Sequence, residues 1–271
     1  MERYTVFGGS GFIGSEFVSK LSSLGHDVHI VKREDPKTYE DNLGIVIFAA
    51  GYGDCNTDPK NVIDANVSLI SEIVSKAKYS KLVYISSTRV YLNSNNTQED
   101  SDVIISNSDV RSLFNLTKLS AEQLILKLDE NSIIIRPSNV YGKALNSNLF
   151  LPSIIRSAIN EGNIKMFVTE MYEKDYVSVE NVVNSTLSLI YNNSKGIFNV
   201  AYGSNTSAKD IAYIIQSETG CNVEWLVEND EDYFHPIDVS KLKNEIDFKP
   251  EFVLNDLKKM IDCFKNIKIE I

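Results

Sequence analysis

A glycine-rich turn between an apolar run and an amphipathic stretch constrains the fold of this 271-residue chain more than any other feature. The turn, GGSGFIG, spans residues 8–14 and follows the run YTVFG, which is typical of a buried strand. It fits the pattern G-x-G-x-x-G, in which glycines allow a tight turn and a close approach of the backbone to a pyrophosphate at a helix amino terminus. The sequence therefore predicts a dinucleotide site formed by Gly8, Ser10, Gly11, Phe12, Ile13 and Gly14.

Strand and helix patterns alternate along the first half of the chain. Five apolar runs have the composition of strands buried on both faces, namely YTVFG, DVHIV, GIVIFAA, KLVYIS and SIIIRP. Three longer stretches have helical periodicity, namely FIGSEFVSKLSSLG, NVIDANVSLISEIVSKAK and SLFNLTKLSAEQLILKLDE. Because strands that alternate with helices form βαβ units, we expect an α/β protein with a doubly wound parallel sheet. Such sheets bind ligands beyond the carboxyl ends of their strands.

The charge of the chain argues against two classes of partner. Its formal net charge is −10 and its pI is about 4.9, whereas nucleic acids and anionic membranes require a basic face. We therefore expect neither as the main partner. The longest apolar run, IVIFAAG, is too short to cross a bilayer, and the opening MERYTVFGG does not resemble a signal peptide, so a cytoplasmic location is expected. The cysteines and histidines show no metal-ligand spacing, so we expect no metal.

The end of the second predicted strand bears on the choice of dinucleotide. In sites of this kind an acidic residue about 20 positions after the glycines binds the 2′-hydroxyl of NAD. Here the strand ends in Lys32 and Arg33, and Glu34 and Asp35 come only afterwards. Two cations suit a 2′-phosphate, although both could also be solvated side chains at a strand end. We expect NADP(H) to be favoured over NAD(H).

A set of motifs in a fixed order resembles a known family. They are GGSGFIG, the pair Ala49-Ala50, Asn66 in DANVSLI, YISSTRVY, FNLTKLSAEQLI, RPSNVYG, DYVSVENV, GIFNVAYG and DVSKLKNEIDFKP. Together they resemble the extended short-chain dehydrogenase/reductases, which are NAD(P)-dependent epimerases, dehydratases and reductases of nucleotide sugars. The resemblance implies a Rossmann domain, residues 1–142 plus about 175–200. It also implies a smaller C-terminal domain that binds the nucleotide sugar, residues 143–174 and 201–271.

The resemblance assigns roles to several residues around the cofactor. Ser87 takes the place of the hydroxyl that hydrogen-bonds the reacting sugar oxygen, and Thr88 lies beside it. Lys118 resembles the lysine that binds the nicotinamide ribose, and Pro137 would lie near the nicotinamide. Ala49 and Ala50 would contact the cofactor after the third strand.

The resemblance also places residues at the substrate. Asn139 would lie near the substrate, and Lys174 fills the place of a basic residue just before the DYVSV stretch. With Arg156 and His235, Lys174 is a candidate to bind the diphosphate of a nucleotide sugar.

Phe114 departs from the family pattern, because it occupies the position of the catalytic tyrosine. A phenol beside a lysine ammonium has a lowered pKa and can move the proton that accompanies hydride transfer, which a phenylalanine cannot do. Three interpretations stay open. The chain is an inactivated form, natural or introduced; or Tyr52, Cys55, Tyr91 or a water held by Ser87 moves the proton; or the chain is a non-catalytic NADP(H)-binding sensor or partner protein.

The residues after Ser87 limit the reaction that the resemblance implies. Family dehydratases carry an acidic pair at that place, whereas this chain has Thr88 and Arg89, so dehydration is disfavoured. What remains is hydride transfer at the sugar C4, by a 4-epimerase or a 4-ketoreductase of polysaccharide biosynthesis. Family members often pair through the helix that carries FNLTK and the helix before it, so a homodimer is expected by analogy.

Overall fold

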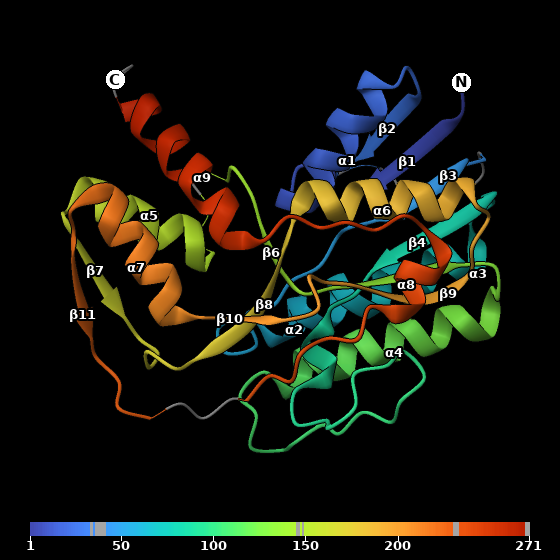
Figure 1. The fold of residues 1–271 in the computed structure, drawn as a ribbon. Helices are drawn as coiled ribbons and strands as arrows, with labels where there is room; N and C mark the ends of the chain where they lie inside the picture. Colours follow the sequence, from blue (N-terminus) through green and yellow to red (C-terminus); the bar gives the residue numbers. More distant parts are fainter. Residues whose placement is uncertain (33–34, 36–41, 145–146, 148, 230–232, 269–271) are drawn as a thin grey trace.

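A six-stranded parallel sheet forms the centre of the molecule (Figure 1). The computed structural model describes residues 1–32, 35, 42–144, 147, 149–229 and 233–268. Within them the strands run in the order β2-β1-β3-β4-β5-β9, and each neighbouring pair is parallel. The strands are β1 (Arg3–Phe7), β2 (Asp27–Val31), β3 (Ile45–Phe48), β4 (Lys81–Ile85), β5 (Ile133–Pro137) and β9 (Gly196–Val200).

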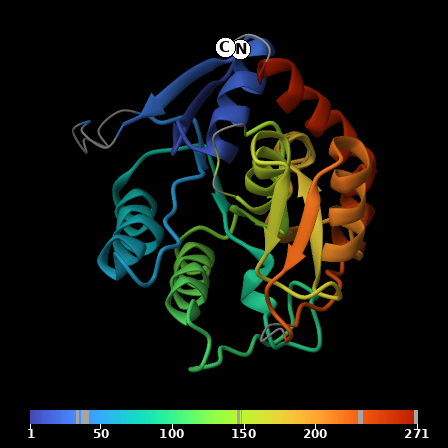
Figure 2. The same ribbon diagram turned by 90° about the vertical axis from the view of Figure 1, so that its left-hand side faces the viewer.

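Helices cover both faces of this sheet, as Figures 1 and 2 show. On one face α1 (Phe12–Ser23) packs beside α6 (Val179–Tyr191), and on the other α3 (Leu69–Lys76) packs beside α4 (Ser112–Leu128). Alternate side chains of each inner strand therefore enter different cores, which explains why these strands are nearly unbroken runs of apolar residues. The predicted doubly wound α/β fold is confirmed.

The strand β2 differs from its prediction. The run DVHIV was expected to be buried on both faces, but none of its five residues is buried, and Ile30 is 37% exposed. Among the described residues β2 pairs only with β1 and ends the sheet. Because an edge strand has packing partners on one side only, an apolar composition does not guarantee its burial.

The strand order places the glycine-rich turn at a topological switch point. After β1 the chain adds β2 on one side, and it then returns to add β3 on the other side. The turn after β1 and the pair Ala49-Ala50 after β3 therefore meet at the carboxyl edge of the sheet, where such folds bind ligands. Gly8 has a φ of +78°, and a Cβ there would lie 2.6 Å from the backbone nitrogen of Ala50. Only glycine allows this approach of the two loops.

A second group of elements has its own hydrophobic core and lies beside the central sheet (Figure 1). It comprises α5 (Phe150–Asn160), β7 (Asn163–Met166), α7 (Ala208–Thr219), β11 (Asn222–Trp225) and α9 (Val253–Lys268). A small sheet of β6 (Asn139–Tyr141), β8 (Glu173–Ser178) and β10 (Asn205–Ser207) connects it to the central sheet. The chain returns to the first core through Leu242 of α8 (Ser240–Glu245). Among the described helices, none has both the length and the apolar character of a membrane span.

Candidate active site

A cavity of about 610 Å³ opens at the carboxyl edge of the central sheet, between the two groups of elements. It brings together most of the residues that the sequence predicted for the site. Those that line it are Gly11, Phe12, Ile13, Ala49, Ala50, Ser87, Thr88, Phe114, Lys118, Pro137, Asn139 and Lys174. The predicted residues Gly8, Ser10, Gly14 and Lys32 do not line it, and Arg33 lies outside the described residues.

The glycine-rich turn has the form that a dinucleotide pyrophosphate needs. Gly11 is the N-cap of α1 and makes no side-chain cap, so no side chain of the N-cap occupies the first N–H groups of this helix. A Cβ at Gly14 would lie 2.1 Å from the carbonyl oxygen of Gly8, so that glycine keeps the helix against the turn. The residues present therefore fit a dinucleotide bound at the start of α1.

We expect Gly14→Ala to weaken both the fold and the binding of NAD. The added methyl group must displace the Gly8 carbonyl, and overpacking of this kind costs about 1 to 3 kcal/mol. Thermal unfolding and a titration with NAD measure the two effects. Ser15→Ala, on the exposed side of the same helix, is the control. If Gly14→Ala binds NAD like the unchanged chain, the turn does not hold the pyrophosphate.

Lys118 lies beneath Phe114 on one face of α4. Its side chain is buried, and its Nζ donates a hydrogen bond of 2.9 Å to the carbonyl oxygen of Ile85. The Nζ also lies 4.9 Å from the ring centre of Tyr84 and 5.8 Å from that of Phe114. Burial lowers the pKa of Lys118 to about 8, against the opposing effect of the nearby Glu122 carboxylate. The lysine that the sequence predicted is thus present without its phenol.

Ser87 follows β4 and begins a short 3₁₀ turn, η2 (Thr88–Tyr91). Its Oγ accepts a hydrogen bond from the backbone N–H of Arg89, so the turn fixes this hydroxyl at the wall of the cavity. The Arg89 guanidinium donates two hydrogen bonds, of 2.7 and 2.9 Å, to Asp109. These bonds hold the pKa of Asp109 below its usual range. The arginine therefore positions a loop and supplies no acid at the place of the dehydratase pair.

Asn66 fixes the loop that follows β3. Its carboxamide accepts from the backbone N–H of Tyr52 and donates to the Tyr52 carbonyl and to the Thr117 hydroxyl. Asn66 lies in a π-helical turn, Asp64–Ser68, between α2 (Pro59–Ile63) and α3. The single helix expected over NVIDANVSLISEIVSKAK is therefore interrupted, because the extra residue of the π turn brings this buried side chain to the loop.

A buried ion pair supports α4 from below. Glu122 accepts hydrogen bonds from the Arg136 guanidinium on β5 and from the Ser86 hydroxyl. Burial by itself would lower the pKa of Arg136, but the hydrogen bonds that it donates to Glu122 raise its pKa, so the guanidinium stays charged. Arg136 also donates to the Tyr91 hydroxyl, which in turn donates to Asn199 of β9. No motif in the sequence predicts this network, since its members are far apart in the chain.

The predicted substrate residues lie in different surroundings. The Nζ of Lys174 on β8 lies 4.9 Å from the ring centre of Tyr172 and 4.7 Å from that of Phe234, at the wall of the cavity. Asn139 on β6 also lines the cavity, and its carboxamide donates a hydrogen bond of 2.8 Å to the Asp175 carbonyl. The other two candidate cations, Arg156 and His235, do not line the cavity.

The structure separates the three side chains that could replace the tyrosine hydroxyl. Tyr52 lines the cavity, in the loop that Asn66 holds. Tyr91 is 3% exposed, and its hydroxyl is hydrogen-bonded within the buried network. Cys55 does not line the cavity, and its thiol donates a hydrogen bond to the Gly53 carbonyl. Tyr52 alone of these three is therefore placed to reach a ligand.

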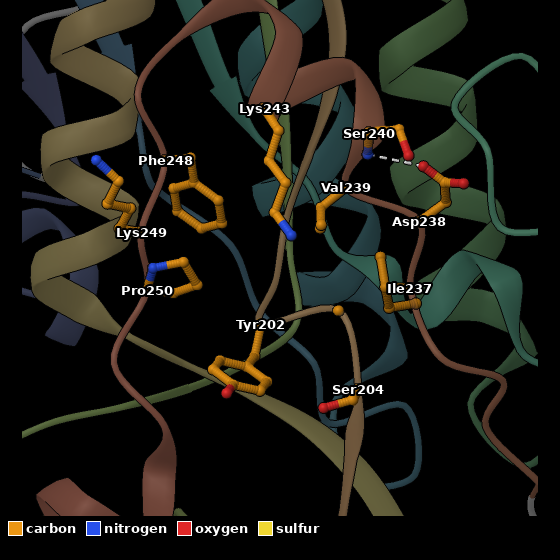
Figure 3. A pocket seen from close by; sticks show the side chains of 11 residues that line it. Tyr202, Ser204, Ile237, Asp238, Val239, Ser240, Lys243, Phe248, Lys249 and Pro250 are labelled. Carbon is orange, nitrogen blue, oxygen red and sulfur yellow. Dashed lines mark hydrogen bonds between the residues drawn. The ribbon is translucent and has the colours of Figure 1, made fainter.

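A second cavity of about 610 Å³ lies between the turn at Tyr202 and the segment around α8 (Figure 3). Lys243 extends towards its centre, and Phe248 and Pro250 form one wall. The lysines that line it are exposed, and it contains none of the residues predicted for the site. It is an open surface hollow, and its lining residues are separate from those of the candidate active site.

The nucleotide-binding turn, the switch point and the serine and lysine of the cavity define a dinucleotide-dependent enzyme fold of the Rossmann class. Residues 4–201 match the model of the NAD dependent epimerase/dehydratase family, and the chain belongs to that family. A protein of Methanocaldococcus jannaschii, named provisionally as a UDP-glucose 4-epimerase, is 25% identical to it over 307 residues. That alignment covers 96% of this chain and 98% of that protein.

Two solved structures share the whole fold. A tyrosine-to-phenylalanine variant of UDP-glucuronic acid 4-epimerase from Bacillus cereus, in complex with UDP-4-deoxy-4-fluoro-glucuronic acid and NAD, has a TM-score of 0.83 and 19% identity. A protein named MoeE5, in complex with UDP-glucose and NAD, has a TM-score of 0.84 and 19% identity. In both cases the likeness covers 98% of this chain and 99% of the other, which shows that the fold is the same.

The expectation of NADP(H) is wrong. Both of these structures hold NAD. In this chain the backbone N–H of Lys32 donates a hydrogen bond of 2.7 Å to the Asp35 carboxylate, which places an acid at the end of β2. A 2′-phosphate would meet a like charge there, whereas a 2′-hydroxyl can donate a hydrogen bond to it. The sequence alone did not predict that the Asp35 carboxylate would lie beside Lys32.

We expect this chain to bind NAD at least about tenfold more tightly than NADP, because a like charge near the 2′-phosphate costs on the order of 1.4 kcal/mol or more. Asp35→Asn should reduce the ratio of NAD affinity to NADP affinity, and Lys32→Ala should change that ratio little. Titrations of the unchanged chain and both variants with each dinucleotide measure the ratio. Tighter binding of NADP by the unchanged chain would contradict the role given to Asp35.

Proposed function

We propose that this chain binds NAD and a nucleoside-diphosphate sugar together and acts at the sugar C4 as a 4-epimerase. The observation that carries the proposal is the convergence of Ser87 and Lys118 with the glycine-rich turn at one cavity. The name of the Methanocaldococcus jannaschii relative and the ligands of the two solved structures support the same assignment.

The chain's own residues favour epimerisation among the reactions of this family. Dehydration requires an acid beside Ser87, and Thr88 and the Asp109-bound Arg89 supply none. Net reduction of a 4-keto sugar normally uses NADPH. The pair Lys32 and Arg33 favoured NADPH, but the NAD in the two solved structures and the position of Asp35 beside Lys32 favour NAD instead. NAD, when bound, supplies a hydride acceptor that can return the hydride to the other face of the sugar, so no external reductant is needed.

Each residue of the cavity then has a proposed task. The Lys118 ammonium binds the nicotinamide ribose, and the Ser87 hydroxyl donates to the sugar O4. Lys174, on β8 of the small connecting sheet, binds the diphosphate, and the rings of Tyr172 and Phe234 hold its ammonium in place. In this proposal the second group of elements forms the substrate domain, although Leu242 of α8, which the sequence prediction assigned to that domain, packs in the core of the central sheet.

Phe114 leaves the proton step to another group. We propose that the chain turns over slowly, with the proton moved by Tyr52 or by water, and that it is an impaired form of a more active enzyme. Loss of a positioned acid/base typically lowers a rate by 10²- to 10⁴-fold without abolishing binding. The aromatic ring keeps the wall of the cavity intact, so cofactor and substrate should still bind.

The test of this assignment is an assay by proton NMR of UDP-glucose and UDP-glucuronic acid with bound NAD. A 4-epimerase converts each substrate that it accepts into its C4 epimer while the NADH absorbance stays constant. A 4-ketoreductase instead consumes one NADH for each keto sugar reduced. Stoichiometric consumption of NADH with a 4-keto sugar, and no interconversion of epimers, would replace the epimerase by the reductase.

Phe114 also favours a second candidate, a dinucleotide-binding protein without chemistry. Such a protein would need the glycine-rich turn and Lys118 but would have no use for Ser87 or Lys174. It would bind NAD and no nucleotide sugar, which separates it from an impaired enzyme.

A further inference from the structure

The charged side chains that line the active-site cavity, within the part of the chain that the structure describes, are all cationic. Among the described residues at its wall the ionised side chains are Arg89, Arg111, Lys118 and Lys174, and no carboxylate is present. The whole chain, in contrast, has a formal net charge of −10. The cavity is therefore a cationic site within an acidic protein, and it suits a ligand with several negative charges.

Three of the four cationic side chains have a structural contact or a proposed role already described. Arg89 is held by two hydrogen bonds to Asp109, and Lys118 is buried against the Ile85 carbonyl. Lys174 is proposed for the diphosphate. Arg111 has no role assigned so far and belongs to none of the family motifs, although it is the N-cap of α4 and lies three residues before Phe114.

The position of Arg111 is set by the residues around the reacting end of the cavity. Its guanidinium carbon lies 4.8 Å from the ring centre of Phe114. A Cβ at Gly53 would lie 3.1 Å from the Arg111 Nη2 and 3.6 Å from the Phe114 ring, so glycine gives both side chains room against the loop after β3. The guanidinium thus lies beside the side chain that takes the place of the catalytic tyrosine.

A short chain of hydrogen bonds connects Arg111 to Ser87. The Asp109 carboxylate accepts from the Arg111 backbone N–H, from the Arg89 guanidinium and from the Asn115 carboxamide. Arg89 in turn donates its backbone N–H to the Ser87 hydroxyl. One connected structure therefore places Arg111 at the end of the cavity where the sugar O4 would lie.

We propose that Arg111 selects a nucleotide sugar whose hexose carries a carboxylate, that is, a nucleoside-diphosphate uronic acid. This proposal rests on the proposed function. The C6 carboxylate of a uronic acid is bonded to C5, next to the reacting C4, and its two oxygens match the two parallel N–H donors of a guanidinium. A neutral hexose over the same guanidinium offers it only hydroxyl groups, which accept weaker hydrogen bonds from a guanidinium than a carboxylate does.

The experiment is a calorimetric titration of the NAD-saturated full chain with UDP-glucuronic acid and with UDP-glucose. We expect the uronic acid to bind about tenfold or more tightly than glucose. Arg111→Ala should weaken the uronic acid by about 10- to 100-fold and glucose by less than about threefold, as loss of a charge-assisted pair predicts. Arg111→Lys keeps the charge and loses the two parallel N–H donors, so its affinity for UDP-glucuronic acid should lie between those of the unchanged chain and Arg111→Ala.

Lys127→Ala removes one positive charge from the exposed far end of the same helix and is the matched control. It should change neither affinity, and all variants should keep the melting temperature of the unchanged chain, because Arg111 is exposed. Equal binding of the two sugars, or an equal loss of both in Arg111→Ala, would overturn the role of Arg111 while the proposed function stands. Failure of both sugars to bind would overturn the proposed function itself and the selection with it.

Discussion

Phe114→Tyr is expected to raise the rate of C4 epimerisation by on the order of 10²- to 10⁴-fold, which is the usual contribution of a positioned acid/base. The new phenol would extend from the ring that lies 5.8 Å from the Lys118 ammonium, on the wall of the cavity that contains Ser87. A neighbouring cation stabilises the phenolate and lowers its pKa towards neutrality. The rate is measured by NMR with the substrates named above.

Three controls make this prediction specific. Adding Lys118→Ala to Phe114→Tyr should remove most of the gain, because the phenol then loses the cation that lowers its pKa. Tyr52→Phe should abolish the residual activity of the unchanged chain if Tyr52 is the substitute, and should matter little once the phenol is restored. No gain in rate from Phe114→Tyr with any nucleotide sugar that binds would show that the chain is not an impaired epimerase.

Glu122→Ala is expected to lower the free energy of unfolding by about 3 to 5 kcal/mol. The substitution leaves the Arg136 guanidinium, which is 3% exposed, buried without its carboxylate partner. It also removes the acceptor of the Ser86 hydroxyl and the negative charge that raises the pKa of Lys118. Denaturation with urea measures the change, and Glu130→Ala, an exposed acid just after α4, is the matched control.

A double replacement distinguishes the loss of the ion pair itself from the cost of leaving one buried charge without a partner. Glu122→Leu together with Arg136→Met removes both charges and should be much less destabilising than Glu122→Ala, because no buried charge is left unpaired. A loss below about 1 kcal/mol for Glu122→Ala would mean that water reaches Arg136 and that the pair is not buried.

Much of the fold could be predicted from the sequence because it depends on local patterns. The glycine-rich turn requires a strand before it and a helix after it, and the runs of Ile and Val predict strands covered on both faces. The exception is β2, whose composition is that of an inner strand although it lies at an edge. Composition reports which residues tolerate burial and not how many neighbours a strand finds.

The site could be predicted only where its residues belong to a family motif. Ser87, Phe114 and Lys118 were predicted in this way, and the three side chains line one cavity. The Glu122–Arg136 pair could not be found, since a buried ion pair and two solvated charges look the same in a sequence. Arg111 was missed for a related reason, because its contact with Gly53 joins two loops that are far apart in the chain.

The choice of cofactor shows how a local pattern can mislead. Lys32 and Arg33 predict a site for a 2′-phosphate, but the Asp35 carboxylate accepts a hydrogen bond from the Lys32 backbone N–H. The polar segment at residues 93–102 is a similar case. Its polar composition is typical of an exposed loop, yet Thr97 is buried and its hydroxyl donates to the Pro236 carbonyl. Tertiary hydrogen bonds decide both positions, and no pattern in the sequence reports them.

The central claim is that one cavity holds NAD and a nucleoside-diphosphate sugar at the same time. A calorimetric titration of UDP-glucuronic acid and UDP-glucose into the chain, with and without saturating NAD, tests it most directly. The account predicts that at least one of the two sugars binds to the NAD-saturated chain at one site, and that Lys174→Ala weakens the sugar and spares NAD. Binding of NAD with no heat from either nucleotide sugar would contradict the claim and leave a dinucleotide-binding protein without chemistry.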